Sequence, residues 1–380
     1  MQWFLWLQLG VASGDSAIRY SRNSIYWGLA STAVYLLVLL LLLFSGFSGG
    51  LQARLEARIG RRWLERILFF FVFTLVTTVL TLPLDYYLGF RREHLYGLSR
   101  ESLAGWWQDS LKELVLSLVA GSLFISLLYP LLRKLPRTWW IGASAVGIAF
   151  LIVLLLIAPV YIDPWFNRFK PVQDPAIRDP ILQMAHRNGI DVDRIYQVDS
   201  SRRTEKVNAY VAGLFNTKRI VLGDTLLARF TPEETTFVMG HEMGHYVLGH
   251  TIKFVLGGSA MIVILFLMTF WLSRVLVDRF APRWGFWKVS NIASLPLLLF
   301  LLTLLATLAM PGFNSFSRRM EAEADRFGLQ QIQDKEVAIR AFEKLGDQNL
   351  AERYPPRLIE ILFYSHPALG RRIENAKNSQ

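Results

Sequence analysis

Six stretches of about 20 mainly apolar residues are the feature that most restricts how this chain can fold. A stretch of that length crosses the hydrocarbon core of a bilayer as a helix, because a helix satisfies its backbone hydrogen bonds internally. Tryptophan and tyrosine gather at several of their ends, where amphipathic rings fit the headgroup region. The predicted spans are 24–44, 66–88, 111–132, 139–161, 254–276 and 289–310. The sequence therefore predicts a mainly α, polytopic helical membrane protein.

The composition agrees with this prediction and excludes several kinds of chemistry. Of the 380 residues 53% are hydrophobic, and the net charge is +11. The chain contains no cysteine, which excludes disulfides, iron–sulfur clusters and thiol nucleophiles and leaves His, Asp and Glu as the strong metal ligands. No block rich in Lys and Arg is interleaved with aromatic residues, so we expect no nucleic-acid partner.

Four regions follow from the distribution of the spans. We expect an N-terminal membrane region with four spans (1–162), an extramembrane region of strands and one helix (163–253), two further spans (254–312) and C-terminal helices (313–380). The opening MQWFLWLQLGVASG is apolar but short and lacks the positive region of a signal peptide. We expect an interfacial or poorly ordered segment.

The extramembrane region contains short runs with strand-like alternation. RIYQVD (194–199), KVNAYVAG (206–213) and KRIVLG (218–223) predict a small sheet outside the membrane. TPEE at 231–234 then places Thr at the N-cap, Pro at the first helical position and Glu at the third. This capping box predicts a helix that begins there.

HEMGHYVLGH (241–250) lies on that helix and carries a metal-binding motif. Residues four apart differ by about 40° around a helix, so His241 and His245 can face one ion. Glu242 lies beside them, within reach of a water on the same metal. This is H-E-x-x-H, in which the histidines bind zinc and the glutamate is the general base. His250 lies roughly 180° from His241 and is not expected to bind the same ion.

The third ligand has to come from another segment. The pattern H-E-x-x-H-x-x-G-x-x-H does not fit, because Gly249 and His250 stand at the wrong offsets. SRRMEAEAD (317–325) is the better source, since Glu321 and Asp325 share one helix face directly after the sixth span. Glu321 would complete a catalytic two-His, one-Glu set, and Asp325 would orient a ligating imidazole. Glu323 should point away.

At this point the chain resembles the integral-membrane zinc endopeptidases that include CAAX prenyl protease 1, the sterile-24 endopeptidase, with heat-shock protease X as a shorter relative. The similarity extends over most of the chain after the first span. The matching segments are LPLDYYLGFRREHLYGLS (82–99), IAPVYIDPWFNRFKPV (157–172), VNAYVAGL (207–214), HEMGH (241–245), SRRMEAEAD (317–325) and SHPALGRRI (365–373). The chain departs from the prenyl protease in having six predicted spans where that enzyme has seven.

The resemblance implies a gluzincin-type zinc-protease region of small α+β fold and a ring of helices that encloses a chamber. It makes Glu321 the third ligand of one zinc ion per chain, places Asn208 and Tyr210 on an edge strand that holds extended substrate, and puts His366 and Arg372 near the scissile carbonyl. These roles have structural alternatives. Asn208 is equally consistent with a hairpin position, and Arg372 with a surface ion pair to Glu374.

We therefore predict a zinc-dependent endopeptidase in which Glu242 activates water, with His366 and Arg372 stabilising the oxyanion. The substrates are expected to be membrane-associated or lipidated (CAAX-type) peptides, or misfolded membrane proteins, and the location a bacterial inner (cell) membrane. The alternatives are a non-enzymatic membrane scaffold and a transporter with a structural metal. The spans contain almost no ionisable residue away from their ends, which argues against a transport path.

The two sequence signals for orientation disagree. Twelve Lys and Arg residues flank the span ends opposite the catalytic segments, against six on the catalytic side. The positive-inside rule then places the catalytic segments outside the cytoplasm, whereas the resemblance implies a site reached from the cytoplasm. A reporter fused after Gln380 decides between them.

Overall fold

The computed structural model describes residues 13–190, 192, 194–212 and 219–379. The opening segment that we expected to be interfacial or poorly ordered lies outside these residues except for its last two. Among the described residues six helices are long and apolar enough to cross a membrane, which confirms the predicted number. The helices are α1 (Ser13–Phe44), α2 (Phe47–Arg58), α3 (Arg62–Tyr86), α4 (Arg92–Leu95), α5 (Leu103–Lys134), α6 (Trp139–Ile157), α7 (Asp163–Phe166), α8 (Pro175–Arg187), α9 (Asp224–Leu227), α10 (Pro232–Val247), α11 (His250–Trp284), α12 (Leu295–Gln330), α13 (Lys335–Gln348), α14 (Arg357–Phe363) and α15 (Leu369–Asn378).

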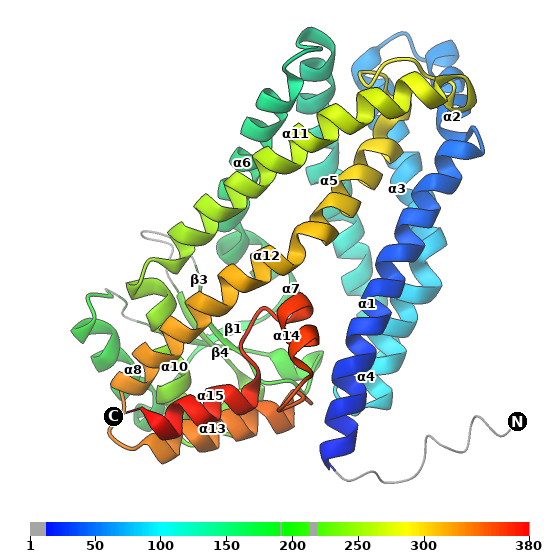
Figure 1. Cartoon of the computed structure of the whole chain (residues 1–380). Helices are drawn as coiled ribbons and strands as arrows, with labels where there is room; N and C mark the ends of the chain where they lie inside the picture. The colour runs from blue at the N-terminus through cyan, green and yellow to red at the C-terminus, as the bar shows by residue number, and fades with distance from the viewer. Residues whose placement is uncertain (1–12, 191, 193, 213–218, 380) are drawn as a thin grey trace, which may run out of the picture.

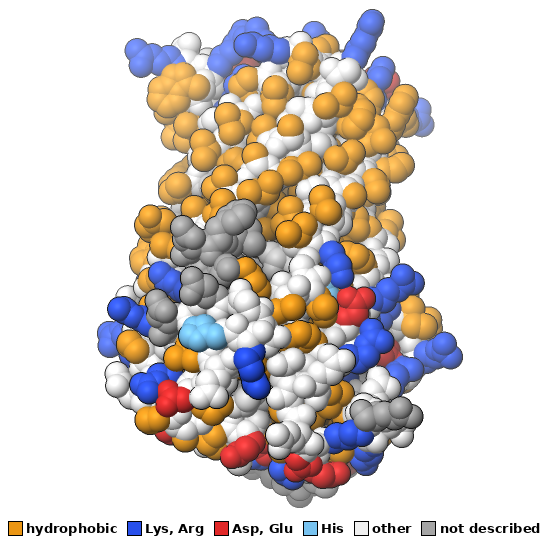
Figure 2. Space-filling model, turned by 90° about the vertical axis from the view of Figure 1, so that its left-hand side faces the viewer, with side chains coloured by type: hydrophobic (Ala, Val, Ile, Leu, Met, Phe, Trp, Pro, Cys, Tyr) orange, Lys and Arg blue, Asp and Glu red, His pale blue; other side chains and the backbone are white. Residues whose placement is uncertain are grey.

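The membrane helices form a closed ring. α1 contacts α12, and the contacts continue through α11, α6, α5 and α3 back to α1. Exposed apolar side chains cover this region on the face seen in Figure 2, as lipid contact requires. The ring agrees with the expectation from the resemblance, while the enclosed chamber stays a prediction.

Several helices continue well beyond the predicted spans. α12 has 36 residues and runs as one helix from the membrane region to Gln330. Hydropathy marks only the part of a helix that faces lipid. The polar part of α12 stays helical because residues such as Asn314 and Ser317 are buried against other parts of the protein. One continuous helix, with Pro311 in its interior, therefore carries both the sixth span and the acidic motif.

The extramembrane sheet has four strands in the order β1-β2-β4-β3. β2 and β4 are parallel, and the outer strands β1 and β3 pair antiparallel to them. Three strands lie in the predicted runs, while β1 is three residues long and ends in proline, too short for a periodic signal. The strands are β1 (Phe169–Pro171), β2 (Ile195–Val198), β3 (Ala209–Ala212) and β4 (Arg219–Gly223). β3 thus occupies one edge of the sheet.

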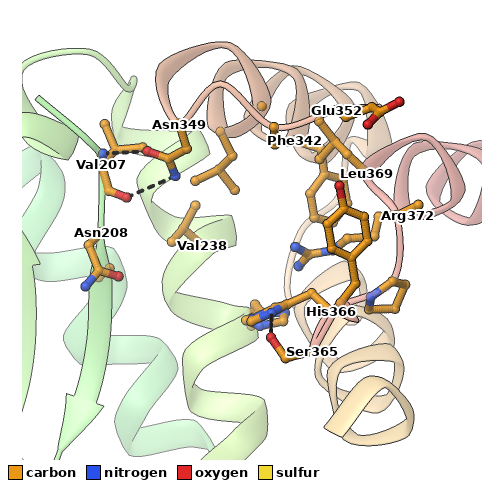
Figure 3. Close-up of a pocket in the computed structure, with 18 of the residues that line it drawn as sticks. Val207, Asn208, Val238, Phe342, Asn349, Glu352, Ser365, His366, Leu369 and Arg372 are labelled. Atoms are coloured by element: carbon orange, nitrogen blue, oxygen red, sulfur yellow. Dashed lines mark hydrogen bonds between the residues drawn. The ribbon is translucent and has the colours of Figure 1, made fainter. Parts of the chain in front are cut away.

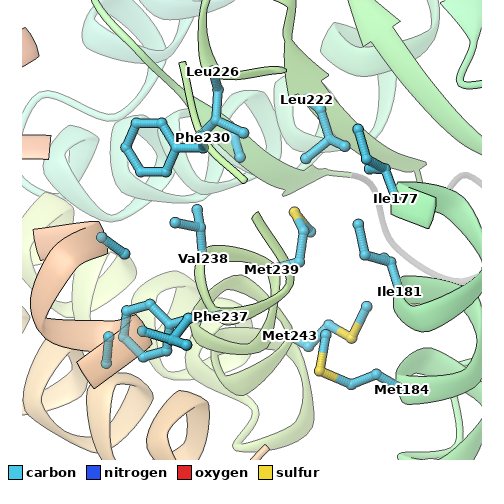
Figure 4. Close-up of a cluster of buried hydrophobic side chains, with 14 of the residues drawn as sticks. Ile177, Ile181, Met184, Leu222, Leu226, Phe230, Phe237, Val238, Met239 and Met243 are labelled. Carbon is cyan, nitrogen blue, oxygen red and sulfur yellow. The ribbon is translucent and has the colours of Figure 1, made fainter. Parts of the chain in front are cut away.

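α10 is held in the middle of the extramembrane core. Its predicted capping box is present, with the Glu234 carboxylate accepting a hydrogen bond from the Thr231 N–H at 2.9 Å. Apolar side chains of α10 pack among those of α8, α9, β4 and α13 (Figure 4). The labelled members are Ile177, Ile181, Met184, Leu222, Leu226, Phe230, Phe237, Val238, Met239 and Met243. Gly249, at φ 67°, then turns the chain from α10 into α11, a conformation that glycine adopts without strain.

Glycines let α10 and α12 approach closely. A Cβ added at Gly240 would lie 3.3 Å from the Cα of Gly328, and one added at Gly328 would lie 3.0 Å from the backbone nitrogen of His241. A Cβ at Gly244 would meet Phe327 at 3.1 Å. Small residues four apart on both helices thus bring the two backbones together.

We expect Gly328→Ala to lower the melting temperature of the purified protein, because the added methyl forces α12 away from α10. Overpacking of this kind costs about 1–3 kcal/mol. Gly312→Ala on the same helix is the control, since its Cβ meets nothing within 4 Å and alanine favours a helix over glycine. An unchanged melting temperature in Gly328→Ala would contradict the close crossing.

Candidate active site

Three side chains on α10 and α12 meet at the crossing of these helices. The ligating atoms of His241, His245 and Glu321 all lie within 4.8 Å of one another. The Nε2 atoms of His241 and His245 are 3.2 Å apart. They lie 3.3 Å and 3.5 Å, respectively, from the Glu321 carboxylate. The structure thus brings together the residues expected to be ligands.

The chemistry of this cluster fits a divalent cation. Two imidazole nitrogens and one carboxylate converge on one point, and Oε2 of buried Glu321 has no hydrogen-bond partner. Burial lowers the pKa of His241, but the carboxylates of Asp325 and Glu321 beside it outweigh burial and raise it to about 9. Burial and the charge of His241 lower the pKa of His245 to about 4. Two buried imidazoles beside a carboxylate are the donor set that metals with N and O ligands prefer.

Asp325 connects the cluster to the C-terminal helix. Its Oδ1 lies 2.8 Å from Nδ1 of His241, the nitrogen opposite the metal-facing one. Arg372 on α15 donates from Nε and Nη2 to the same carboxylate at 2.8 Å and 2.6 Å. The suggested surface pair between Arg372 and Glu374 is therefore not the arrangement found, because the guanidinium is turned inward.

Glu242 and the C-terminal residues border one cavity of about 420 Å³ beside the cluster. Burial raises the pKa of the Glu242 carboxyl to about 7. His366 also lines the cavity, with Nε2 3.3 Å from the Glu321 carboxylate and Nδ1 2.9 Å from the Ser365 hydroxyl. The cavity thus places a carboxyl group, an imidazole and the Arg372 guanidinium around one space next to a metal-binding cluster.

The edge of the sheet forms the opposite wall of this cavity. Figure 3 shows Asn208 across the cavity from His366 and Arg372. Asn208 directly precedes β3, and its carbonyl accepts from the Gly223 N–H at 2.9 Å. Tyr210 lies on β3 but is not among the residues that line the cavity. Its hydroxyl donates to Asp163 at 3.5 Å instead.

The sequence analysis missed residues that support the site from outside. His250 is no ligand, but its Nδ1 lies 3.0 Å from Nδ1 of His245, and its Nε2 lies 3.0 Å from Glu323. Glu323 does point away from the metal cluster, as expected, and its carboxylate orients the His250 imidazole. Asn349 accepts from the Val207 N–H at 3.0 Å and donates to its carbonyl at 3.3 Å (Figure 3). The short distance in sequence between His245 and His250 could have indicated that the two imidazoles are in contact. No motif indicated that Asn349 would hold the backbone of Val207.

Comparison with known proteins supports one family along nearly the whole chain. Residues 171–380 match Peptidase family M48, and residues 12–168 match the family described as CAAX prenyl protease N-terminal, five membrane helices. Among the described residues of the second region, four helices are long and apolar enough to span a membrane.

Individual relatives agree with this match. An uncharacterized metalloprotease of Bacillus subtilis, YhfN, is 33% identical over 308 residues, which is 79% of this chain and 70% of the relative. CAAX prenyl protease 1 of Saccharomyces cerevisiae is 30% identical over 77% of this chain and 68% of its own length. The crystal structure of S. mikatae Ste24p superposes with a TM-score of 0.82 at 26% identity, covering 97% of this chain and 90% of that one.

These matches do not favour the scaffold or the transporter. The membrane ring, the extramembrane unit and the motif-bearing helices lie in matched regions. The relatives are named as metalloproteases and CAAX prenyl proteases, and the family implies a metal ion and peptide or protein substrates. The chain therefore belongs to peptidase family M48 and is a multi-pass membrane metalloprotease of the CAAX prenyl protease family.

Proposed function

We propose that the metal is one zinc ion held by His241, His245 and Glu321, and that Glu242 is the general base of peptide hydrolysis. The observation that carries this proposal is the convergence of the three ligating atoms within 4.8 Å on the wall of a cavity that Glu242 also lines. Two histidines and a glutamate form the ligand set of catalytic zinc that keeps one position open.

Zinc, when bound, supplies a Lewis acid that lowers the pKa of a water toward about 7. Glu242 takes the proton of the attacking water and later gives it to the leaving amine. A carboxyl whose pKa is raised to about 7 is suited to both transfers near neutral pH, because it exchanges a proton at little cost in either direction.

His366 and Arg372 stand where the carbonyl oxygen gains negative charge. Both line the cavity beside the cluster. Arg372 is held by two hydrogen bonds to Asp325, so its charge is in place before substrate arrives, which is what electrostatic stabilisation of an oxyanion requires. In the same proposal Asp325 fixes the His241 imidazole with Nε2 toward the metal.

Substrate is proposed to bind as an added strand along β3, beside Asn208 and Tyr210. The Asn208 carbonyl faces β4, since it accepts from the Gly223 N–H. Along a strand the backbone N–H and C=O groups of successive residues point alternately to one neighbouring strand and to the other side. Ala209 and Val211 therefore present their N–H and C=O groups to the open edge. Main-chain pairing of this kind tolerates many substrate sequences. The next residue whose backbone faces the open edge is Val207, and its N–H and C=O are already bonded to the Asn349 side chain. Asn349 therefore limits how far an added strand can extend in this direction.

The substrates in this proposal are membrane-associated peptides, either lipidated at a CAAX-type end or derived from misfolded membrane proteins. The extramembrane unit sits directly on the spans, and apolar residues such as Phe342 and Leu369 line the cavity. The relative from Bacillus subtilis supports a bacterial cell membrane as the location. Nucleic acid is not a proposed partner.

Glu242→Gln should retain one zinc per chain and lose hydrolysis by at least about a hundredfold, because only proton transfer is removed. Glu321→Ala should lose both zinc and cleavage. Zinc is measured by elemental analysis, and cleavage with one fluorogenic peptide prepared with and without a C-terminal prenyl group.

Each arm of this experiment has its own contradicting result. Full turnover in Glu242→Gln would exclude that residue as the base, and zinc retained by Glu321→Ala would exclude Glu321 as a ligand. Equal cleavage of the two peptides would remove the prenyl group as a determinant and leave misfolded membrane proteins as the substrate class.

Asp325→Asn should weaken zinc binding about 10- to 100-fold, the usual effect of losing the partner of a metal-bound imidazole. The dissociation constant is measured by competition with a chromophoric chelator. Glu343→Gln, a half-buried carboxylate on α13 that pairs with Arg353 and does not line the cavity, is the control. Unchanged affinity in Asp325→Asn would contradict the role given to this residue.

Val211→Pro should lower kcat/KM about fivefold, because proline removes an N–H that faces the open edge, and one lost hydrogen bond is worth about 1 kcal/mol. Zinc content should stay at one per chain. Val211→Ala keeps the N–H and is the matched control. Equal loss in both variants would assign the effect to the side chain and contradict strand addition.

A further inference from the structure

A second cavity, of about 920 Å³, lies far from the metal cluster. Its walls come from α2, the start of α3, the connection between α5 and α6, the end of α11 and the segment 287–292. In Figure 1 these parts lie together at the end of the ring opposite the sheet, and the space-filling view shows Lys and Arg side chains gathered at this end (Figure 2). The metalloprotease activity gives this cavity no role.

The lining carries an excess of positive charge, with six cations against the three carboxylates Glu56, Glu65 and Asp278. Its cations are Arg62, Arg66, Arg133, Arg137, Arg274 and Lys288. Among the described residues none of the six forms an ion pair with a carboxylate, in contrast to cations of the catalytic end such as Arg22, which meets Glu352 at 2.7 Å. Like charges around one space repel each other, so an anion from outside the chain stabilises this arrangement.

A carboxylate of low exposure, Glu65, also lines the cavity, with the charges of Arg62 and Arg66 nearby. Glu65 is 7% exposed and makes neither a hydrogen bond nor an ion pair within the described part of the chain. Its carboxylate oxygens are not among the buried unpartnered atoms of the described residues, so they open into the cavity and can accept hydrogen bonds from a group bound there. A ligand that satisfies the whole cavity therefore combines an anionic group for the arginines with hydroxyl or similar donors for Glu65.

The position of the cavity identifies the class of that ligand. Five candidate spans begin or end beside it, at Arg62, Lys134, Trp139, Trp284 and Ile292. Trp139 is buried in its wall, and Trp287 is 68% exposed at its rim. Tryptophan marks the headgroup level of a bilayer. Apolar side chains such as Val277 and Ile292 continue the wall, as the glycerol and upper acyl parts of a lipid require.

We propose that this cavity binds the headgroup of an anionic phospholipid, with its phosphate among the arginines and its headgroup hydroxyls at Glu65. Basic pockets between membrane helices recognise lipid headgroups through the same combination of charge and depth. The site is independent of hydrolysis, because it lies at the other end of the ring from the metal cluster.

The test measures binding of dioctanoylphosphatidylglycerol to the full-length protein in neutral detergent by titration calorimetry. Arg66→Gln, Arg137→Gln and Arg274→Gln are combined in one variant. The matched control combines Arg58→Gln, Arg279→Gln and Arg283→Gln, which remove the same charge at the same end without lining the cavity. We expect binding at least about tenfold weaker in the cavity variant and unchanged in the control.

Other arms separate the lipid from other anions. Dioctanoylphosphatidylcholine, which lacks net charge and headgroup hydroxyls, should bind at least about tenfold more weakly than the glycerol lipid, and inorganic phosphate should not displace that lipid. Should the triple variant fail to fold, Arg274→Gln alone, at an exposed position, should still weaken binding. Equal loss in both triple variants, equal affinity for the two lipids, or displacement by phosphate alone would each overturn the proposal.

Discussion

The close crossing of α10 and α12 is the contact on which the rest of the site depends. Neither helix contains a complete metal site, since α10 supplies two imidazoles and α12 supplies the carboxylates. The residues meet only because Gly240 and Gly244 on one helix face Gly328 and Ala324 on the other at backbone contact distance. The capping box at Thr231 and the left-handed Gly249 fix the ends of α10, and apolar packing around Phe237 and Met243 fixes its rotation.

Much of this arrangement could be predicted from sequence because its signals are local. Six apolar stretches predicted six spans, and the spacing of His241 and His245 predicted a shared face on a helix. Alternation predicted β2, β3 and β4. The spacing of Glu321 and Asp325 pointed to the acidic side of the cluster, since i and i+4 residues share a face, and the structure places both next to His241.

Contacts between distant segments could not be predicted in the same way. Asn349 pairs with Val207 across 142 residues. Arg372 donates to Asp325 and not to Glu374, which is much closer in sequence. Such choices depend on how whole helices dock, which no short pattern encodes. The edge position of β3 was expected from a resemblance, but the turning of Tyr210 toward Asp163 was not. The cavity lined by Arg66 and Arg274 likewise arises from five separate segments and has no sequence motif.

The continuity of α12 has a mechanical consequence. At 36 residues the helix is about 54 Å long. It passes from the basic end of the ring to the metal cluster as one continuous helix. It therefore acts as a lever, and a rotation of about one degree around one end moves the other end by about 1 Å. A misplacement of that size matters to a catalytic centre. The thickness and lateral pressure of the surrounding bilayer affect helix tilt. The position of Glu321 therefore depends on the bilayer.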